Sequence, residues 1–414
     1  MKVRSKIGEI SGEISMPSSK SLLHRYLIMG SRNNNTELLV NHISKDVLTT
    51  IEILEKLGSH IEYNDSKIKM NFSSLSYPAS INFVESGSSY RFLLPYCFIE
   101  ERTMAFKAEG RLPERPMKPM IDQLKCNDIV FSNDRLPFIA KGKISGGHFA
   151  FPGNQSSQFI SGIMLIAPFL HRDVTIDIKG DLKSKSYVDI TKSCMEEFGV
   201  TIEIDKNYSK IFIAKSQYED DKFVEVEGDW SNAIVPISLA LTKGQVYIEG
   251  LREDSFQGDA GIIKVLRDMG ADINWVDKRL LIKKSKLSSF NLNIEDNIDL
   301  FPVLSILAIA CQEKSTFTNI SRLRMKESDR IESTLALHKE IGSLAYVDGD
   351  NFIVEPSKLK DRARVYSFND HRIVMAAVVA SSMMESLEIE GFEAIEKSFP
   401  NFIETMTMLG AEIG

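Results

Sequence analysis

One pattern recurs six times along the 414 residues of this chain. In each copy a short polar cluster opens a long apolar run, as in SSKSLLHRYLIMG and NQSSQFISGIMLIA. Because a repeat fixes the architecture before any single motif is interpreted, this pattern constrains the fold more than any other feature. Successive copies are 67 to 74 residues apart when their anchors are Ser21, Ser88, Ser157, Ser231, Asp299 and His371.

Each repeat is expected to hold a second helix, 24 to 28 residues after its anchor. The expected first residues of these helices are Lys45, Arg115, Lys185, Gln257, Lys326 and Lys397. Five of the six end on a glycine that can take the left-handed conformation, followed by the alternating pattern of a strand. In the second repeat QLKCNDIVF has no such glycine, so its helix end is expected to be shorter or irregular.

Six α/β repeats of about seventy residues favour two domains of three, because a chain of this length exceeds one hydrophobic core. An open solenoid is the alternative. The spacing of about seventy residues argues against it, because the common helical solenoids have shorter repeats. No long Pro/Gly linker separates the repeats, so the junction is expected to be a tight hinge near residues 226–229.

Composition narrows the class of protein. The chain has 50 basic and 57 acidic residues, a net charge of −7, which argues against a nucleic-acid surface. Its first residues lack the apolar stretch of a signal peptide or membrane helix, so a cytoplasmic protein with no membrane contact is expected. Four scattered cysteines predict reduced, mostly buried thiols. Phosphate-loop, HExxH, GxSxG and metal-spaced His/Cys motifs are lacking, so no metal is expected.

The polar clusters lie where a helix N-terminus attracts anions. Ordinary capping is the better interpretation of any one cluster, but six in register favour anion binding. Lys326 and Arg330 are expected on one helical face, with a solvated face as the alternative. Asp299 is expected to cap a helix or act as a base, and His371 receives no definite role. Basic residues accompany these helix openings and imply a substrate set with several phosphates and carboxylates: Lys20, Arg25, Arg91, Arg115, Lys326, Arg330, Arg372 and Lys397.

Nine motifs in order along the chain resemble the signature set of the EPSP synthase family. They are MPSSKSLLHR, ESGSSYR, LPERPM, SSQF, KSKSY, FQGD, LRMKESDR, NDHR and KSFP. The resemblance implies an α/β enolpyruvyl transferase fold of two domains, each of three βαβαββ repeats about a pseudo-threefold axis. It places residues 19–226 in an N-terminal domain and residues 1–18 with 227–414 in a C-terminal domain, with the active site in the cleft between them.

The same resemblance implies an activity. The enolpyruvyl group of phosphoenolpyruvate would move to the 5-hydroxyl of shikimate 3-phosphate by addition and then elimination of phosphate, in the shikimate pathway. Both substrates are small molecules, no cofactor is required, and a monomeric enzyme that is a glyphosate target is expected.

Family roles carry over to matching positions. Asp299 resembles the base at the 5-hydroxyl, Glu327 the acid that protonates the methylene carbon, and Lys20 a residue that touches both substrates. Shikimate 3-phosphate would contact Lys20, Ser21, Arg25, Ser156, Ser157, Gln158, Ser184, Tyr187, Asp299 and Lys326. Phosphoenolpyruvate would contact Lys20, Gly87, Arg115, Gln158, Arg330, Arg372 and Lys397.

Three residues differ from the family pattern, and two other functions are alternatives to EPSP synthase activity. Glu85, Ser88 and Arg322 differ from the usual residues beside the substrate pockets, which bears on substrate affinity and the glyphosate response. The sister enzyme, UDP-N-acetylglucosamine enolpyruvyl transferase, would carry a reactive cysteine near Gly110, where EGRLPER has none. A non-catalytic protein that binds an anion on the same scaffold is the second alternative.

Overall fold

The computed structural model describes residues 1–215, 219 and 221–414. These residues form two compact units. The first unit is Ser19–Val226, and the second unit is Met1–Ser18 together with Glu227–Gly414. Each unit buries its own hydrophobic core, so each is described by itself.

In the first unit, helices and strands alternate in the order that the repeats predict. Its helices are α1 (Lys20–Gly30), α2 (Lys45–Leu57), α3 (Gly87–Tyr96), α4 (Lys118–Cys126), α5 (Ser157–Ile166) and α6 (Lys185–Glu197), with short 3-10 turns η1 (Leu112–Glu114) and η2 (Ala167–Phe169). Its strands are β3 (Asn35–Leu39), β4 (Ser59–Asn64), β5 (Lys67–Phe72), β6 (Ser80–Asn82), β7 (Arg102–Lys107), β8 (Val130–Phe131), β9 (Phe138–Gly142), β10 (Gly147–Pro152), β11 (Val174–Lys179), β12 (Ile202–Ile204), β13 (Lys210–Ile213) and β14 (Asp221–Glu225).

The described strands of this unit form three sheets of four strands, all built in the same way. Their orders are β14-β3-β5-β4, β6-β7-β9-β8 and β10-β11-β13-β12. In each sheet the first two strands are parallel and the other neighbours antiparallel. Strand β14 comes from the end of the unit and pairs with β3 near its start, which closes the set of three repeats.

The second unit repeats this architecture. Its helices are α7 (Trp230–Lys243), α8 (Ile262–Asp268), α9 (Phe301–Leu307), α10 (Arg330–Ile341), α11 (His371–Ser381) and α12 (Phe402–Met408), with 3-10 turns η3 (Gly258–Gly261), η4 (Ala308–Ala310), η5 (Ser321–Met325) and η6 (Phe392–Lys397). Its strands are β1 (Lys2–Ile7), β2 (Ile10–Ser15), β15 (Gly244–Glu249), β16 (Asp272–Val276), β17 (Arg279–Lys283), β18 (Asn291–Asn293), β19 (Ser315–Thr318), β20 (Leu344–Asp348), β21 (Asn351–Glu355), β22 (Arg362–Tyr366), β23 (Ser386–Glu390) and β24 (Ala411–Ile413).

Its sheets run β16-β17-β15-β2, β18-β19-β21-β20 and β22-β23-β1-β24. Strand β2 pairs in parallel with β15, and β1 pairs antiparallel with both β23 and β24. The first eighteen residues therefore complete two sheets whose other strands follow residue 227. The α/β class and the threefold repetition within each unit are confirmed.

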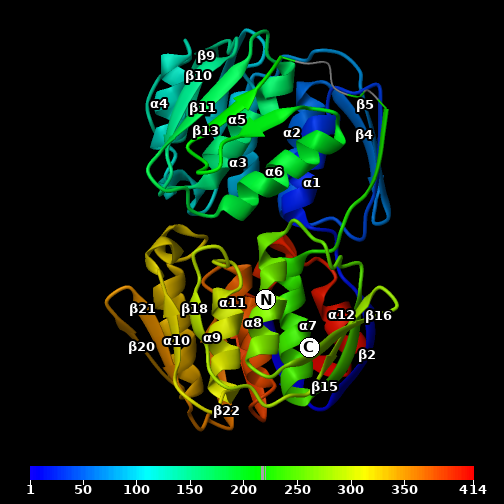
Figure 1. The fold of residues 1–414 in the computed structure, drawn as a ribbon, viewed down its shortest axis with the longest axis vertical. Coiled ribbons are helices and arrows are strands. Elements are labelled where there is room, and N and C mark those ends of the chain that lie inside the picture. The colour runs from blue at the N-terminus through cyan, green and yellow to red at the C-terminus, as the bar shows by residue number, and fades with distance from the viewer. Residues whose placement is uncertain (216–218, 220) are drawn as a thin grey trace. The chain divides into compact units, whose positions relative to one another are not determined.

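The helices opened by polar clusters form the centre of each unit. Helices α7, α9 and α11 are buried along almost their whole length and pack against one another, as Figure 1 shows for the lower part of the ribbon. A helix that is apolar on every side must be buried, which explains why these three runs lack a polar stripe. The polar openings of these inner helices are thereby brought to one end of the unit.

The expected starts of the second helices are confirmed at Lys45 and Lys185 and wrong elsewhere. Arg115 is extended because a proline follows it, and α4 begins at Lys118. Lys326 is also extended, and α10 begins only at Arg330, after Asp329. Lys326 and Arg330 are therefore not on one helical face.

The other two expected starts are also wrong. Gln257 is extended and precedes η3, with α8 following from Ile262. Lys397 closes η6 and α12 begins at Phe402, after Pro400. Proline lacks the backbone N–H that continues a helix, and Pro400 lies between η6 and α12, where the second helix of this repeat is divided.

The glycine helix ends are confirmed. Gly58, Gly199, Gly270, Gly342 and Gly410 all have positive φ, from 78° to 117°. In the second repeat Asp128 takes the left-handed conformation with φ of 65°, after a helix of nine residues. The missing glycine is thus replaced by a residue type that tolerates this conformation.

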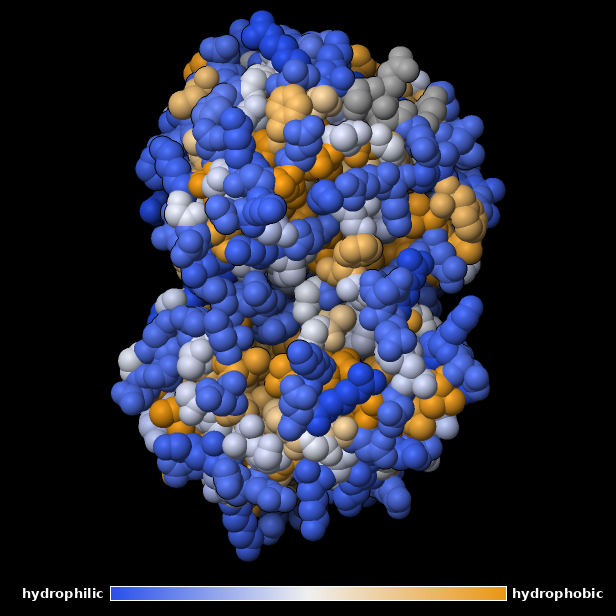
Figure 2. Space-filling view, in the orientation of Figure 1, coloured by the Kyte–Doolittle hydropathy of each residue, from blue (hydrophilic) through white to orange (hydrophobic). Residues whose placement is uncertain are grey.

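The surface is mostly polar. Figure 2 shows hydrophilic side chains over most of one face, with smaller apolar areas between them. Among the described helices, none is long and apolar enough to cross a membrane. The thiols of Cys97, Cys194 and Cys311 are buried and that of Cys126 is exposed, and all four are free.

Candidate active site

Capping at the inner helices is performed mainly by residues just before the anchors. The hydroxyls of Ser19, Ser86 and Ser156 accept hydrogen bonds from backbone N–H groups of the first turns of α1, α3 and α5. In the second unit the carboxylates of Asp229 and Asp370 do the same for α7 and α11. Capping and anion binding are therefore compatible, because neighbouring residues of one cluster can perform them separately.

In the first unit, Lys20 is the first residue of α1. Its ammonium group lies 2.9 Å from the Asp46 carboxylate, and both side chains are mostly buried. Asp46 is the second residue of α2, so this ion pair joins the two helix openings of the first repeat. It holds the lysine at the end of the unit where α1 begins.

Arg115 lies directly against the opening of α3. A Cβ atom added to Gly87 would come within 2.6 Å of the Arg115 guanidinium, so only glycine leaves room for it. Gly87 is the first residue of α3, where backbone N–H groups are unpaired by the helix itself. The guanidinium and the helix N-terminus together form a cationic surface suited to a phosphate.

The openings of α3 and α5 are joined by side chains. The Gln158 amide donates to the Ser88 hydroxyl at 3.0 Å and accepts from the Arg91 guanidinium at 2.5 Å. Ser157 is buried beside them as the first residue of α5. The candidate residues of the second and third repeats therefore meet.

Arg25 is buried and makes its hydrogen bonds to other residues of the first unit. Its guanidinium donates to the Ser21 carbonyl at 2.6 Å, the Tyr187 carbonyl at 3.1 Å and the Thr191 hydroxyl at 2.8 Å. Burial lowers its pKa to about 10. Arg25 thus ties α1 to α6, whose opening carries Ser184 with φ of 56° in the left-handed region.

In the second unit, Arg330 is the centre of the candidate site. It is 1% exposed, and its guanidinium contacts three carboxylates: Asp299 at 2.5 Å, Glu327 at 2.7 Å and Asp370 at 2.9 Å. Burial alone would lower the pKa of Arg330, but these three carboxylates raise it above its ordinary value. One arginine therefore fixes both residues expected to transfer protons.

Asp299 is ionised by its surroundings. The Lys326 ammonium lies 3.1 Å from the same oxygen that Arg330 contacts. Burial would raise the pKa of Asp299, but the charges of Lys326 and Arg330 outweigh it and hold that pKa well below its ordinary range. A carboxylate kept in its charged form can accept a proton.

Arg372 and Lys397 join the same cluster. Asp370, which is fully buried, accepts from the backbone N–H of Arg372 at 2.9 Å as well as from Arg330. The Arg372 guanidinium donates to the Ser231 carbonyl at 2.7 Å, and Lys397 donates to the Asn369 carbonyl at 2.8 Å. Candidate residues of two repeats, together with Ser231 of a third, therefore converge within this unit.

Sequence reasoning gave no role to several residues that the structure places in these clusters. Asp370 contacts the Arg330 guanidinium and caps the helix at the backbone N–H of Arg372, and Asp46 pairs with Lys20. Asp259 lies beside the opening of α7, where it accepts a hydrogen bond from Ser231. The signals were weak: Asp370 precedes a helix as any cap does, and Asp259 was visible only as part of the FQGD motif.

All three departures lie beside candidate residues, and the Ser88 hydroxyl accepts its hydrogen bond from the candidate residue Gln158. A Cβ atom on Gly110 would meet the Glu85 carboxylate at 2.0 Å, so Glu85 packs against the segment that leads to Arg115. Arg322 lies near Lys326, whose pKa is lowered by burial first and also by Arg330 and Arg322.

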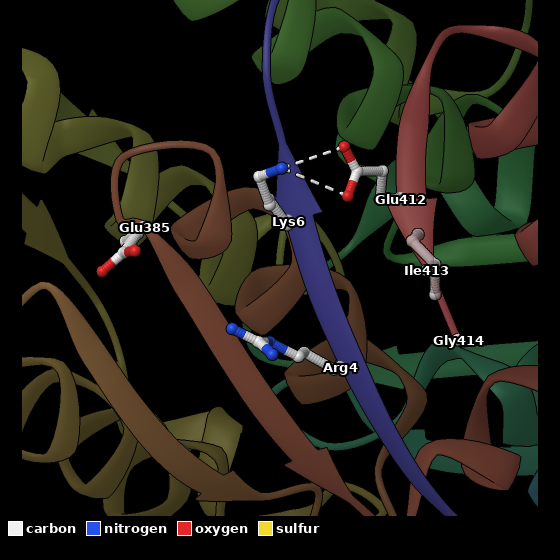
Figure 3. A pocket seen from close by; sticks show the side chains of 6 residues that line it. All are labelled: Arg4, Lys6, Glu385, Glu412, Ile413 and Gly414. Atoms are coloured by element: carbon white, nitrogen blue, oxygen red, sulfur yellow. Dashed lines mark hydrogen bonds and ion pairs between the residues drawn. The ribbon is translucent and has the colours of Figure 1, made fainter.

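A hollow on the second unit contains none of the candidate residues. Figure 3 shows Arg4 and Lys6 on β1, flanked by Glu385 and Glu412, in a hollow of about 580 Å³. Lys6 contacts both carboxylate oxygens of Glu412, at 3.0 and 3.2 Å. This hollow lies on the sheet and not at the helix openings. No group of three or more His, Cys, Asp or Glu side chains in the described part of the chain could hold a metal ion.

Solved structures define the class of fold. The chain superposes on EPSP synthase from Acinetobacter baumannii with a TM-score of 0.82 at 23% identity, covering 100% of both chains. It superposes on the enolpyruvyl transferase NikO from Streptomyces tendae with a TM-score of 0.80 at 13% identity, covering 100% of this chain and 98% of that one. The fold is therefore that of the enolpyruvyl transferases.

Sequence comparison gives the family. The family model for EPSP synthase (3-phosphoshikimate 1-carboxyvinyltransferase) matches residues 4–406. The 3-phosphoshikimate 1-carboxyvinyltransferases of Clostridium kluyveri and Clostridium acetobutylicum are each 34% identical, covering 98% of this chain and 96% of the relative. The chain belongs to the EPSP synthase family.

Proposed function

We propose that the clusters of the first unit and those of the second unit supply the groups that bind the substrates and catalyse the reaction of this family. The enzyme transfers the enolpyruvyl group of phosphoenolpyruvate to the 5-hydroxyl of shikimate 3-phosphate and releases phosphate. The observation that carries the assignment of residues is a cluster within one unit, in which Arg330 contacts both Asp299 and Glu327 and Lys326 contacts Asp299.

Asp299 is the base in this proposal. The reaction requires a group that takes the proton of the 5-hydroxyl as its oxygen attacks C2 of phosphoenolpyruvate. Support comes from the position of Asp299, whose carboxylate is fixed in its charged form by contacts with Lys326 and Arg330.

Glu327 is the acid that protonates the methylene carbon. Its carboxylate is paired with Arg330 at 2.7 Å, and a proton on it would weaken that pair. We therefore propose that Glu327 takes up its proton only when Arg330 turns toward the carboxylate of phosphoenolpyruvate. Substrate binding and the protonation of the acid would then be coupled.

The cations divide between the charged groups of the substrates. Arg330 and Arg372 would hold the carboxylate of phosphoenolpyruvate, because arginine binds carboxylates through two parallel hydrogen bonds. Fixed cations around the departing phosphate stabilise the charge that grows on it. These are Lys20, Arg115 and Lys397, with Gly87 and Gln158 beside them.

Shikimate 3-phosphate would occupy the openings of α1, α5 and α6. Its phosphate would contact serine hydroxyls at the openings of α5 and α6, and Lys326 would balance the negative charge of the phosphate. The residues proposed are Lys20, Ser21, Arg25, Ser156, Ser157, Gln158, Ser184, Tyr187, Asp299 and Lys326. We also propose a monomeric cytoplasmic enzyme that uses no cofactor.

The decisive experiment mixes the purified protein with both substrates and follows the release of inorganic phosphate. Release that requires both substrates is expected. UDP-N-acetylglucosamine in place of shikimate 3-phosphate is the control for the sister activity. Phosphate release at the background rate, with a folded protein, would refute the proposed function.

A further inference from the structure

A buried carboxylate lies behind the candidate site of the second unit. Asp259 is 5% exposed and is the second residue of η3. Its Oδ2 atom accepts a hydrogen bond from the Ser231 hydroxyl, and its Oδ1 atom accepts from the Asn297 amide at 3.2 Å. The two donors belong to different repeats, so Asp259 links the opening of α7 to the segment before α9.

Both donor residues, Ser231 and Asn297, are also connected to residues of the candidate site. The carbonyl of Ser231 accepts the hydrogen bond from the Arg372 guanidinium at 2.7 Å. Asn297 lies two residues before Asp299, and its carbonyl accepts from the backbone N–H of Leu300 at 3.0 Å. Asp259 therefore supports Arg372 on one side and the turn that carries Asp299 on the other.

We infer that Asp259 is a positioning residue that sets the distance and orientation between Arg372 and Asp299. The inference rests on the proposed function, because it concerns the geometry of that site. Removing a buried acceptor leaves the Ser231 and Asn297 donors without their partner, and both would then move toward other acceptors. A small displacement of reacting groups costs much of the rate.

The electrostatics agree with this geometry. Burial first, and then the negative charge of Asp299, raise the pKa of Asp259 to about 6. The described charged groups that face Asp259 are Asp299 from the turn before α9 and Arg372 from α11, while α7 contributes only the Ser231 hydroxyl. Below about pH 6 a protonated Asp259 would accept fewer hydrogen bonds, so activity should fall there.

The first test compares Asp259→Asn with Asp268→Asn, an exposed aspartate at the end of the next helix. Asp259→Asn should lower kcat/KM for phosphoenolpyruvate on the order of 10- to 100-fold, through both kcat and KM, and remove the acid limb near pH 6. Asp268→Asn should match the wild type. The double variant D259N/N297D exchanges donor and acceptor across the same pair and should recover part of the loss.

A second readout does not depend on turnover. Both tryptophans of the chain lie at this opening, since Trp230 is the first residue of α7 and its ring lies 6.4 Å from that of Trp275. Intrinsic fluorescence should titrate near pH 6 in the wild type and not in Asp259→Asn. Glu227→Gln is the control, because Glu227 accepts from the Trp230 indole at 2.8 Å and burial raises its pKa too.

The outcomes separate this inference from the proposed function. If the wild type releases phosphate and Asp259→Asn keeps its kcat, KM and pH limb, the positioning role is refuted. If the wild type releases none, the proposed function fails, and the positioning role, which depends on it, falls with it. The fluorescence titration then still decides whether Asp259 is the group that titrates near pH 6.

A separate observation concerns the first unit, at the opposite ends of α1 and α3. Arg32 follows α1, and Arg102, which is 4% exposed, begins β7. Glu100 pairs with Lys143 at 3.2 Å and more weakly with Arg32 at 3.5 Å. Among the ion pairs of the described residues, Lys143 and Arg32 thus share one carboxylate, and Arg102 has no ion pair.

Several N–H groups of this cluster lack partners. Within the described residues, Nε and Nη1 of Arg102 and Nε of Arg32 are buried without a hydrogen-bond acceptor. The guanidinium groups lie over the rings of Tyr77 and Phe72, at 5.2 and 5.4 Å. The rings cover the flat faces of the guanidinium groups but accept no hydrogen bond at their edges, and burial lowers the pKa of Arg102.

The geometry points to a binding site for a small oxyanion between Arg32 and Arg102, with phosphate or a carboxylate as the ligand. A charged group that is buried without a counter-group is unfavourable, and an oxyanion supplies both the charge and the acceptors. The site is separated from Lys20 by the length of α1, about 16 Å for its eleven residues. It is therefore distinct from the proposed substrate contacts.

The test uses Arg102→Met, which keeps apolar bulk in the buried position, and Arg135→Met, an exposed control. Both are made in an Arg115→Ala background, so that the proposed substrate site binds phosphate weakly. Inorganic phosphate and malonate are titrated by equilibrium dialysis and by thermal unfolding. The Arg135→Met protein should bind one anion and be stabilised by it, and the Arg102→Met protein should do neither.

The anion that binds identifies the ligand class. Binding of phosphate alone or of malonate alone supports the site and assigns its chemistry. Equal binding by both variants, or no binding by either, overturns the proposal and leaves water as the partner of these N–H groups.

Discussion

Arg330 shows how one residue organises the candidate chemistry of the second unit. Its guanidinium has five N–H donors in a rigid plane, so it can contact Asp299, Glu327 and Asp370 at once. A lysine offers a single charged point and could not hold three carboxylates in fixed directions. The contacts are buried, so losing one partner would leave an uncompensated charge.

Asp299→Asn tests the base at this scale. The amide keeps the shape of the carboxylate but cannot take the proton of the 5-hydroxyl, so turnover should fall at least about 100-fold. KM for both substrates should change much less, because a base acts mainly in the transition state. Steady-state phosphate release measures both constants, with the exposed Asp296→Asn as control. Unchanged turnover would remove Asp299 from this role.

Arg115→Ala tests the assignment of the phosphoenolpyruvate subsite. The lost guanidinium should raise KM for phosphoenolpyruvate about tenfold or more, since a charge-assisted hydrogen bond to phosphate is lost. Affinity for shikimate 3-phosphate should stay nearly constant. The control is Arg111→Ala, an exposed neighbour that pairs with Glu114 at 3.6 Å. Equal losses for both substrates would contradict the subsite.

Helix openings and helix ends are the elements on which the site depends. Inner helices begin with capping residues such as Ser86 and Asp370. These caps stabilise the first turns of the helices, and the first turns are where we expect the substrates to bind. Outer helices end on left-handed residues that turn the chain into the next strand. The end of α2 is an example, because Gly58 lets the chain pass close to a neighbouring loop.

Gly58→Ala should therefore destabilise the protein. Its φ is 117°, and a Cβ atom would lie 1.9 Å from the backbone oxygen of Ser74. We expect a loss of about 2 kcal/mol or more in the free energy of unfolding. Gly8→Ala is the control, because nothing lies within 4 Å of its Cβ position. Chemical denaturation measures both, and equal stabilities would show that this loop moves without cost.

The whole molecule has two hydrophobic cores joined by two crossings of the chain. One core contains described residues between Leu22 and Val226, and the other contains Val3 to Met16 with Trp230 to Ala411. The crossings lie between residues 18 and 19 and between 226 and 227. Proteins with separate cores often depart from a single two-state transition.

Core substitutions should act on one unit at a time. Leu93→Ala in α3 and Leu304→Ala in α9 each remove a fully buried side chain, at a cost of about 2 to 5 kcal/mol. Calorimetry of the unliganded protein should show that each variant lowers a different component of the unfolding transition. The same shift of one undivided transition in both variants would mean that the units unfold together.

The sequence alone predicted the six repeats, the inner helices with polar openings and the left-handed helix ends, because each depends on residues close together in the chain. It missed four helix starts, some for reasons that are also local, such as the proline after Arg115, Pro400 and the cap at Asp329. The candidate residues came mainly from family motifs and not from spacing.

Only the tertiary structure decided which of these residues meet. Asp370 contacts Arg330 across 40 positions, and Arg372 reaches Ser231 across 141. Sequence pattern carries no signal for such contacts, because they arise when three similar repeats pack their helix openings together. The repeats determine where polar residues lie in the sequence, at the helix openings. The packing of the repeats determines which of these residues contact one another.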